Sequence, residues 1–246
     1  MRARLAGRTA WVIGGGSGLG AAAAAALAAE GAQVVLSGRR TAALAAQAAT
    51  IGAAGGRATC RPLDVTEPGA VAAAAAEIGP LDILVYSSGT NVTRRAFGEI
   101  DAAGWRQVID VNLTGAFDAA HSVLPAMRAR GDGLVVLISS WAGWRLEPVA
   151  GAAYSASKRA LLALAETINA EAGPDGVRAT CICPAEVDTD VLDTRPVPPS
   201  AAARARMLRP ADIGALVGFV ATAPAHMCVN EVVVSPTANS FYRARA

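Results

Sequence analysis

The chain has 246 residues, of which 22 are basic and 20 acidic, and its formal net charge is +2. This weak balance, with basic and acidic residues interleaved, argues against a nucleic-acid partner, and no run approaches the ~18 consecutive apolar residues of a membrane span. The four cysteines and two histidines have no metal-ligand spacing, so we expect no bound metal. Taken together, these features predict a cytoplasmic protein without a nucleic-acid or membrane partner.

Short apolar runs rich in Val, Ile and Leu recur along the chain, and each has the length of a β-strand. They lie at 9–13, 33–37, 58–63, 82–86, 133–138, 177–183 and 231–235. Helix-forming tracts alternate with them at 18–30, 41–51, 68–78, 101–130, 152–172 and 210–222. This alternation predicts a doubly wound α/β fold, in which a parallel sheet of about seven strands has helices on both faces. At this length we expect residues 1–246 to form a single domain.

The least regular segment is 184–209, where prolines, acids and arginines break any helical or strand period. Irregular connections at the surface often carry binding residues. We therefore expect a mobile substrate loop at about 184–209.

A glycine-rich turn, GGGSGLG at 14–20, joins the first predicted strand to the first predicted helix. Such a turn lets the backbone approach a pyrophosphate while the helix N-terminus offers free N–H groups. Gly14, Gly18 and Gly20 have the spacing G-x-x-x-G-x-G, which differs from G-x-G-x-x-G. A plain strand-to-helix turn is the alternative, but the position of the glycines favours a dinucleotide site.

The second predicted strand ends in Gly38-Arg39-Arg40. An acidic residue at this place would bind the ribose 2′-hydroxyl of NAD, whereas guanidinium groups suit the 2′-phosphate of NADP. The sequence therefore predicts NADP(H) as the cofactor. NAD(H) is the less favoured alternative, in which the arginines form only a solvated basic turn.

Lys158 is the only lysine in the chain, and it follows Tyr154 by four residues. Positions i and i+4 share one face of a helix, so both side chains can act in one site. A nearby ammonium is expected to lower the tyrosine pKa from about 10, and a compact ammonium fits two ribose hydroxyls better than a guanidinium. The alternative, which applies to most isolated YxxxK matches, is a half-buried tyrosine beside a chance lysine.

Ser139 and Ser140 end the fifth predicted strand, at the edge where open α/β sheets bind ligands. Together with the glycine turn and the Tyr154–Lys158 pair, they make the chain resemble the short-chain dehydrogenase/reductase family, which has a Rossmann-like fold. The resemblance extends from residue 8 to about 237. Its ordered motifs are GGGSGLG 14–20, LDV 63–65, VNLTGAF 111–117, ISS 138–140, YSASK 154–158 and PAEVDT 184–189.

The resemblance implies a catalytic tetrad of Asn112, Ser140, Tyr154 and Lys158. Tyr154 would exchange the proton, and Lys158 would adjust its pKa and bind the ribose. Ser140 would orient the carbonyl group. Asn112 would hold a water that connects Lys158 to solvent.

The resemblance also implies adenine contacts from Asp64 and Val65 and nicotinamide contacts from Val187 and Thr189. The full set of expected cofactor-binding residues is Gly14, Ser17, Gly18, Leu19, Gly20, Arg39, Arg40, Asp64, Val65, Ser87, Gly89, Tyr154, Lys158, Val187 and Thr189.

Four features depart from the usual family pattern and affect turn packing and the pocket mouth. They are Ile13 in place of threonine, Tyr86-Ser87-Ser88-Gly89 in place of Asn-Asn-Ala-Gly, Ala185 in place of glycine, and a 140–154 loop one residue longer than the commonest spacing.

We therefore expect an NADP(H)-dependent carbonyl reductase that interconverts a small ketone and a secondary alcohol. A redox-inactive dinucleotide-binding regulator on the same fold is the alternative, since fold alone does not prove function. The segments that should rim the substrate pocket carry six residues whose roles the sequence leaves open: Arg94, Arg95, Trp141, Trp144, Glu147 and Glu186.

The helical tracts 101–130 and 152–172 carry more apolar positions than one sheet-facing stripe needs. Paired helices would bury the surplus. Because relatives commonly pair these two helices, we expect a homo-oligomer, either a homotetramer or a dimer.

Overall fold

Seven parallel strands form one sheet in the order β3-β2-β1-β4-β5-β6-β7 in the computed structural model, which describes residues 3–195 and 197–242. The strands are β1 (Thr9–Ile13), β2 (Gln33–Gly38), β3 (Arg57–Pro62), β4 (Ile83–Tyr86), β5 (Gly133–Ile138), β6 (Val177–Pro184) and β7 (Glu231–Val234). The chain starts at the centre with β1, moves outward to β3 and returns to β4 on the other side of β1. This reversal confirms the doubly wound α/β fold and places a ligand-binding switch point between β1 and β4.

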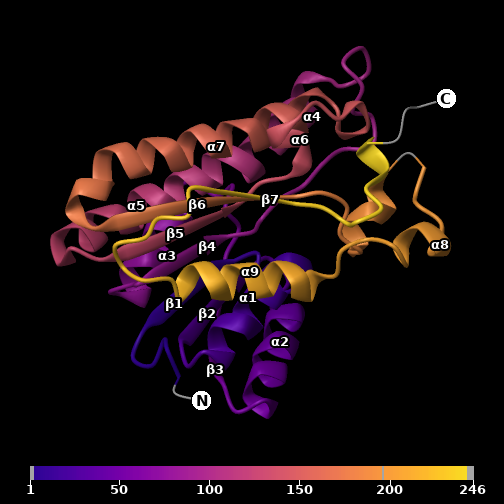
Figure 1. The fold of residues 1–246 in the computed structure, drawn as a ribbon. Coiled ribbons are helices and arrows are strands. Elements are labelled where there is room, and N and C mark those ends of the chain that lie inside the picture. The colour runs from indigo at the N-terminus through magenta and orange to yellow at the C-terminus, as the bar shows by residue number, and fades with distance from the viewer. Residues whose placement is uncertain (1–2, 196, 243–246) are drawn as a thin grey trace.

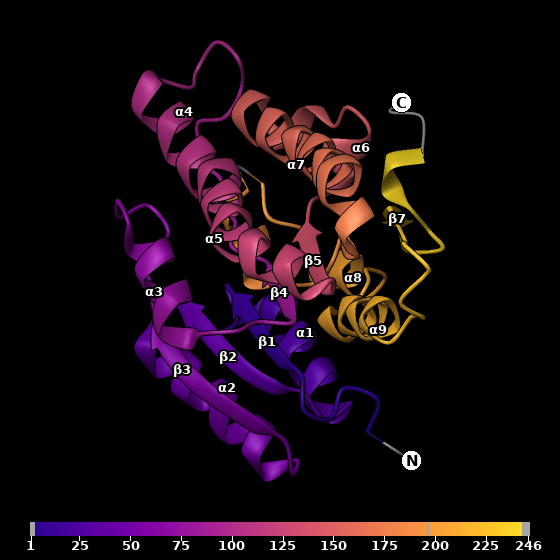
Figure 2. The same ribbon diagram turned by 90° about the vertical axis from the view of Figure 1, so that its left-hand side faces the viewer.

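Helices cover both faces of the sheet (Figure 1). One layer contains α1 (Gly18–Ala29), α2 (Thr41–Ala53) and α9 (Pro210–Ala221). The other contains α3 (Ala70–Ile78), α4 (Ala102–Ile109), α5 (Gly115–Arg130) and α7 (Ala152–Ala172), and Figure 2 shows the sheet between the layers. Short helices α6 (Trp141–Trp144) and α8 (Ala201–Arg204) lie in the connections that follow β5 and β6.

Each face of the sheet packs its own hydrophobic core, with Trp11 and Tyr86 on the α5 and α7 side and Leu27 and Leu36 on the α1 and α9 side. The alanine-rich sequence of α1 serves close packing. A Cβ added to Gly214 of α9 would lie 2.6 Å from the carbonyl oxygen of Ala22. Small side chains on both helices therefore allow their backbones to approach.

The tract expected as one helix at 101–130 is interrupted by a π-helical turn at Asp110–Thr114, which separates α4 from α5. Such turns insert a residue into a helix and often occur at functional sites. Asn112 lies in this turn and is fully buried. The helix-forming tract expected at 101–130 is thus helical throughout as α4, the π-helical turn and α5, and the turn falls at a candidate catalytic residue.

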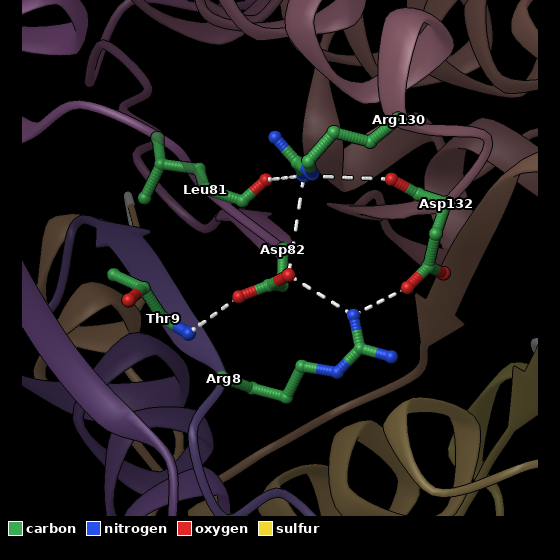
Figure 3. A network of polar contacts seen from close by, with 6 residues as sticks. All are labelled: Arg8, Thr9, Leu81, Asp82, Arg130 and Asp132. Atoms are coloured by element: carbon green, nitrogen blue, oxygen red, sulfur yellow. Dashed lines mark hydrogen bonds and ion pairs between the residues drawn. The ribbon is translucent and has the colours of Figure 1, made fainter.

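A network of arginines and aspartates joins strand starts at the edge opposite the glycine turn (Figure 3). Asp82 accepts from the backbone N–H of Thr9 at 2.7 Å and from Arg8 at 3.0 Å. Arg8 also bonds Asp132, and Arg130 bonds the carbonyl of Leu81. These contacts hold β1, β4 and β5 in register at the end of the sheet away from the candidate site.

Among the described residues, no helix is both long and apolar enough to cross a membrane. Nor does that part of the chain gather three or more His, Cys, Asp or Glu side chains in a way that could hold a metal ion.

Candidate active site

The glycine turn after β1 is closely packed, and its glycines are needed for different reasons. Gly14 has a φ of 87°, and a Cβ there would lie 2.7 Å from the backbone nitrogen of Ser88 after β4. A Cβ on Gly20 would overlap the Gly14 carbonyl group, so the first turn of α1 lies directly under the loop. The start of α1, with its free N–H groups, therefore faces the space above the turn.

That space is a cleft along the carboxyl ends of the central strands. It is lined by all but two of the expected cofactor residues, namely by Gly14, Ser17, Gly18, Leu19, Arg39, Arg40, Asp64, Val65, Ser87, Gly89, Tyr154, Lys158 and Thr189. The exceptions are Gly20, which packs beneath Gly14, and Val187, which lines a neighbouring cavity. The sequence motifs, although far apart in the chain, thus meet at one cleft.

Two arginines at the end of β2 form the basic side of this cleft, and both are exposed. Arg40 reaches across to the glycine turn, where it donates to the Ser17 hydroxyl at 2.7 Å. The backbone N–H and hydroxyl of Thr66 lower the pKa of Asp64, to which the charge of Arg39 also contributes. No acidic residue stands at the end of β2, in the position that would favour NAD.

Ser140 and Tyr154 face each other from the starts of α6 and α7. The Ser140 oxygen caps α6 by accepting from the Ala142 N–H at 3.2 Å, which leaves its hydroxyl hydrogen free to donate. Gly143 permits the close approach of the two helices, because a Cβ there would lie 2.6 Å from both the Ser139 oxygen and the Lys158 carbonyl oxygen.

The pKa of Tyr154 is raised by burial, which outweighs the opposing effects of the Ser140 hydrogen bond and the charges of Arg195 and Arg95. The net direction is therefore opposite to the expected lowering, and Lys158 is not among the groups that shift this pKa. The Lys158 ammonium lies 5.8 Å from the centroid of the Tyr154 ring and donates to the carbonyl of Ile138. Because burial lowers the Lys158 pKa to about 8, its charge is already lost over the pH range in which the Tyr154 phenol titrates.

Lys158 lies at the floor of the cleft with 4% of its surface exposed. Its Nζ donates to the Ile138 carbonyl oxygen at 2.8 Å, and an added Cβ on Gly89 would lie 3.3 Å from Nζ. Burial lowers the Lys158 pKa to about 8. The ammonium therefore exchanges its proton within reach of neutral pH.

Asn112 lies behind Lys158 and lines neither cavity. Its side chain accepts from the Thr90 N–H at 2.7 Å and donates to the Thr90 carbonyl and the Ser157 hydroxyl, both at 3.0 Å. Ser157 in turn donates to the Tyr154 carbonyl at 2.8 Å. Asn112 thus fixes the strand-end turn against α7, while its expected role in holding a water stays a prediction.

Two of the family departures have structural partners. The Tyr86 hydroxyl donates to the Val111 carbonyl in the π-helical turn, and Gly115 leaves room for that hydroxyl. Ala185 donates its N–H to the Val234 carbonyl at 2.8 Å and lines the neighbouring cavity. Tyr86 therefore fastens the end of β4 to the segment that carries Asn112.

The neighbouring cavity begins at Ser140 and Tyr154 and extends under the segment expected as the substrate loop. Of the six rim residues left open by the sequence, Arg95, Trp141, Glu147 and Glu186 line this cavity, whereas Arg94 and Trp144 do not. Residues that the sequence reasoning missed are Asn91, Val149, Val191, Leu192, Arg195 and Phe241.

Phe241 comes from the C-terminal segment, which folds back over α6. Its ring centroid lies 5.7 Å from that of Trp141, and Tyr242 packs edge-on against the same indole at 5.2 Å. Trp144 packs on Trp141 from another side at 5.0 Å. No local motif signals this aromatic cluster, because only the fold brings its members together.

A doubly wound sheet with a glycine turn, a cleft at the switch point and a tyrosine–lysine pair is typical of oxidoreductases that use a nucleotide cofactor. The family model described as short chain dehydrogenase matches residues 8–197. The chain belongs to the short-chain dehydrogenase/reductase family, whose members are oxidoreductases.

Similar proteins cover most of the chain. A glycine betaine reductase, ATRR, from Emericella nidulans is 36% identical in an alignment 245 residues long, which covers 94% of this chain but only 19% of that protein. A cis-4-hydroxycyclohexanecarboxylate dehydrogenase from Sinomonas cyclohexanicum is 34% identical over 235 residues, covering 92% of this chain and 94% of that one. A metagenomic short-chain oxidoreductase, solved in complex with NADP, is 33% identical with a TM-score of 0.82, covering 95% and 99% of the two chains.

Proposed function

We propose that this protein is an NADP(H)-dependent reductase and dehydrogenase that interconverts a ketone and a secondary alcohol. The single observation that carries the proposal is that Tyr154 lines both the dinucleotide cleft and the neighbouring cavity. A group that exchanges a proton with the substrate while the cofactor exchanges a hydride must stand at such a junction.

The residues of the cleft fit a dinucleotide. Gly14 and Gly20 leave no room for a Cβ, so the turn packs closely on its neighbours, and Ser17, Gly18 and Leu19 line the cleft at the start of α1, where a pyrophosphate would bind. Arg39 and Arg40 offer guanidinium groups for a 2′-phosphate, and the bond from Arg40 to Ser17 supports this basic side from the glycine turn. The bound nicotinamide supplies or accepts the hydride.

The chain's own residues handle the carbonyl oxygen and the proton. Ser140, fixed by the Ala142 N–H, donates its hydroxyl hydrogen to the carbonyl oxygen and so orients it. Tyr154 donates a second hydrogen bond and then its proton, for which the raised pKa keeps the phenol protonated at neutral pH. Lys158 binds the nicotinamide ribose and, with a pKa near 8, passes protons onward.

The test is a Tyr154→Phe variant, assayed by NADPH oxidation with a panel of ketones. We expect wild-type turnover of at least one ketone, and a loss of at least 10²-fold in the variant. NADPH binding, followed by fluorescence, should stay within a few-fold of wild type. Wild-type protein that binds NADPH yet oxidises it with no carbonyl compound would favour the redox-inactive regulator instead.

We also propose that the chain forms a homo-oligomer through α5 and α7. Phe117 of α5 is 50% exposed. The outer side of α7 lines a shallow groove that includes Ala156, Ala160 and Ala163. Light scattering at micromolar concentration should therefore give two or four times the 24.7 kDa chain mass, whereas a single 24.7 kDa particle would contradict the proposal.

A further inference from the structure

Arg95 is a charged side chain in the wall of the substrate cavity, and only 7% of the residue is exposed. Its backbone lies against the turn that starts α7, because Gly151 has a φ of 78° and a Cβ there would overlap the Arg95 carbonyl group. Asn91 strengthens the same contact by donating to the Ala150 carbonyl at 2.9 Å. The fold therefore holds Arg95 beside the helical turn that carries Tyr154.

Arg195 also lines the cavity, on the segment that follows β6. Its Nη1 pairs with Glu186 at 2.8 Å, and the second carboxylate oxygen of Glu186 accepts from the Ser240 hydroxyl at 2.6 Å. Ser240 thus orients the Glu186 carboxylate, whose other oxygen holds the Arg195 guanidinium in place. Because a guanidinium is a planar fork of five N–H donors, a bond through Nη1 leaves others for a second anion.

The two guanidinium groups act on each other and on Tyr154. Burial, followed by the charge of Arg195, lowers the pKa of Arg95. The charges of Arg195 and Arg95 both lower the Tyr154 pKa against the larger effect of its burial. Both guanidinium groups therefore act as positive charges beside the Tyr154 hydroxyl, although Glu186 balances Arg195, and they would attract an anionic group of a substrate.

The remaining wall of the cavity suits a short carbon skeleton. Trp141, Val149, Leu192 and Phe241 supply apolar surface. Glu147 also lines the cavity, and its carboxylate accepts from the Val149 N–H of its own turn at 3.4 Å. A substrate that enters here meets apolar side walls, and the polar groups of the cavity include the two arginines, the Ser140–Tyr154 pair and the carboxylates of Glu147 and Glu186.

We propose that the substrate carries a carboxylate, so that the enzyme interconverts an oxo acid and the corresponding hydroxy acid. This inference rests on the proposed function and names the substrate class of the same site. Arg95 and Arg195 bind the carboxylate while Ser140 and Tyr154 bind the carbonyl oxygen. In reduction, hydride adds to the carbonyl carbon, the C=O π bond breaks, and the oxygen takes the Tyr154 proton; the carboxylate is unchanged.

The test compares straight-chain oxo acids with their methyl esters, which keep the skeleton and remove the charge. The pairs are 3-oxobutanoate, 4-oxopentanoate and 5-oxohexanoate with the matching esters, each assayed with NADPH. We expect the best acid to exceed its ester at least tenfold in kcat/KM. In Arg95→Met, kcat/KM should fall at least 30-fold for that acid, mainly through KM, and less than threefold for the ester.

Arg94→Met is the matched control, because Arg94 is the neighbouring residue, is exposed and does not line the cavity. It should leave both values within twofold of wild type. Equal losses for acid and ester in Arg95→Met would overturn the carboxylate contact. So would a wild-type preference for the esters or for neutral polyols.

A measurement on the wild type alone keeps the inference testable if Arg95→Met does not fold. Butanoate, pentanoate and hexanoate should inhibit competitively at least tenfold more strongly than the matching amides, and added salt should weaken that inhibition. Equal inhibition by acids and amides would contradict the inference. Turnover of neutral ketones but not of oxo acids would sink the inference alone, whereas no turnover of any carbonyl compound with NADPH or NADH would sink the proposed function.

Discussion

Replacing Lys158 by arginine keeps the positive charge and changes only its shape, and it should remove most of the activity. Lys158 has 4% of its surface exposed, and its Nζ lies between the Ile138 carbonyl, at 2.8 Å, and the backbone of Gly89. A guanidinium is broader than an ammonium, so it must displace one of these neighbours or leave the cleft floor. Overpacking a buried position costs about 1–3 kcal/mol, and an unsatisfied buried carbonyl costs a similar amount.

About 2–3 kcal/mol of this cost should fall on the complex of the variant with cofactor and substrate. The kcat/KM of Lys158→Arg should therefore be roughly 30- to 150-fold lower than that of the wild type. The assay is NADPH oxidation with the best ketone of the panel, together with NADPH affinity from fluorescence titration. Arg159→Lys is the control, because Arg159 is the next residue and donates to backbone carbonyls of α6. Wild-type turnover by Lys158→Arg would refute the reasoning that the site needs the compact ammonium.

Arg39→Ala should reduce the preference for NADPH over NADH about ten- to a hundredfold, since a charge-assisted hydrogen bond contributes about 1.5–3 kcal/mol. If the ratio of kcat/KM with NADPH to kcat/KM with NADH does not change, the basic turn is only a solvated surface. Gly143→Ala should lower the free energy of unfolding by about 1–3 kcal/mol and reduce kcat, because the new Cβ would lie 2.6 Å from the Lys158 carbonyl oxygen. Gly52→Ala is the control: a Cβ there meets nothing within 4 Å, so neither the free energy of unfolding nor kcat should fall. The folded-state Lys158 pKa, about 8, lies below its unfolded value of 10.5, so the unfolded chain holds more protons between pH 8 and 10.5 and stability rises with pH across that range. The free energy of unfolding of the wild type, measured with denaturant, should therefore increase by roughly 1–2 kcal/mol relative to that of Lys158→Met from pH 8 to 9.5. A difference that stays constant with pH would show that the ammonium is not desolvated.

Local pattern was enough to predict the sheet and the convergence of the expected cofactor residues on one cleft. Each buried parallel strand must be a short apolar run, and Gly14 and Gly20 of the turn mark places where backbones meet, as at Gly14 and Ser88. These constraints act over a few residues and therefore remain visible in the sequence. The carboxyl ends of parallel strands share one edge, so the separate motifs had to converge.

What escaped prediction depends on contacts between distant segments. The π-helical turn around Asn112 leaves no mark in the apolar period, although it is fastened by the Tyr86 hydroxyl from β4. Phe241 reaches the substrate cavity only because the C-terminal segment packs on Trp141. The direction of the Tyr154 pKa was also missed, since spacing places a lysine nearby but does not tell how strongly burial shifts both pKa values.

The chain has a single lysine, Lys158, and otherwise uses arginine, and this choice follows from the different roles of Lys158 and Arg95 at the site. Arg95 is also buried, yet an arginine whose pKa is lowered by burial stays protonated at neutral pH, as a residue that holds a carboxylate must. Lys158, whose pKa falls to about 8 under the same desolvation, can release its proton and so can take part in proton transfer. Exchanging the two residue types would therefore harm the site in opposite ways. Arginine at 158 would hold its proton at every working pH, and lysine at 95 would make carboxylate binding fade as the pH rises.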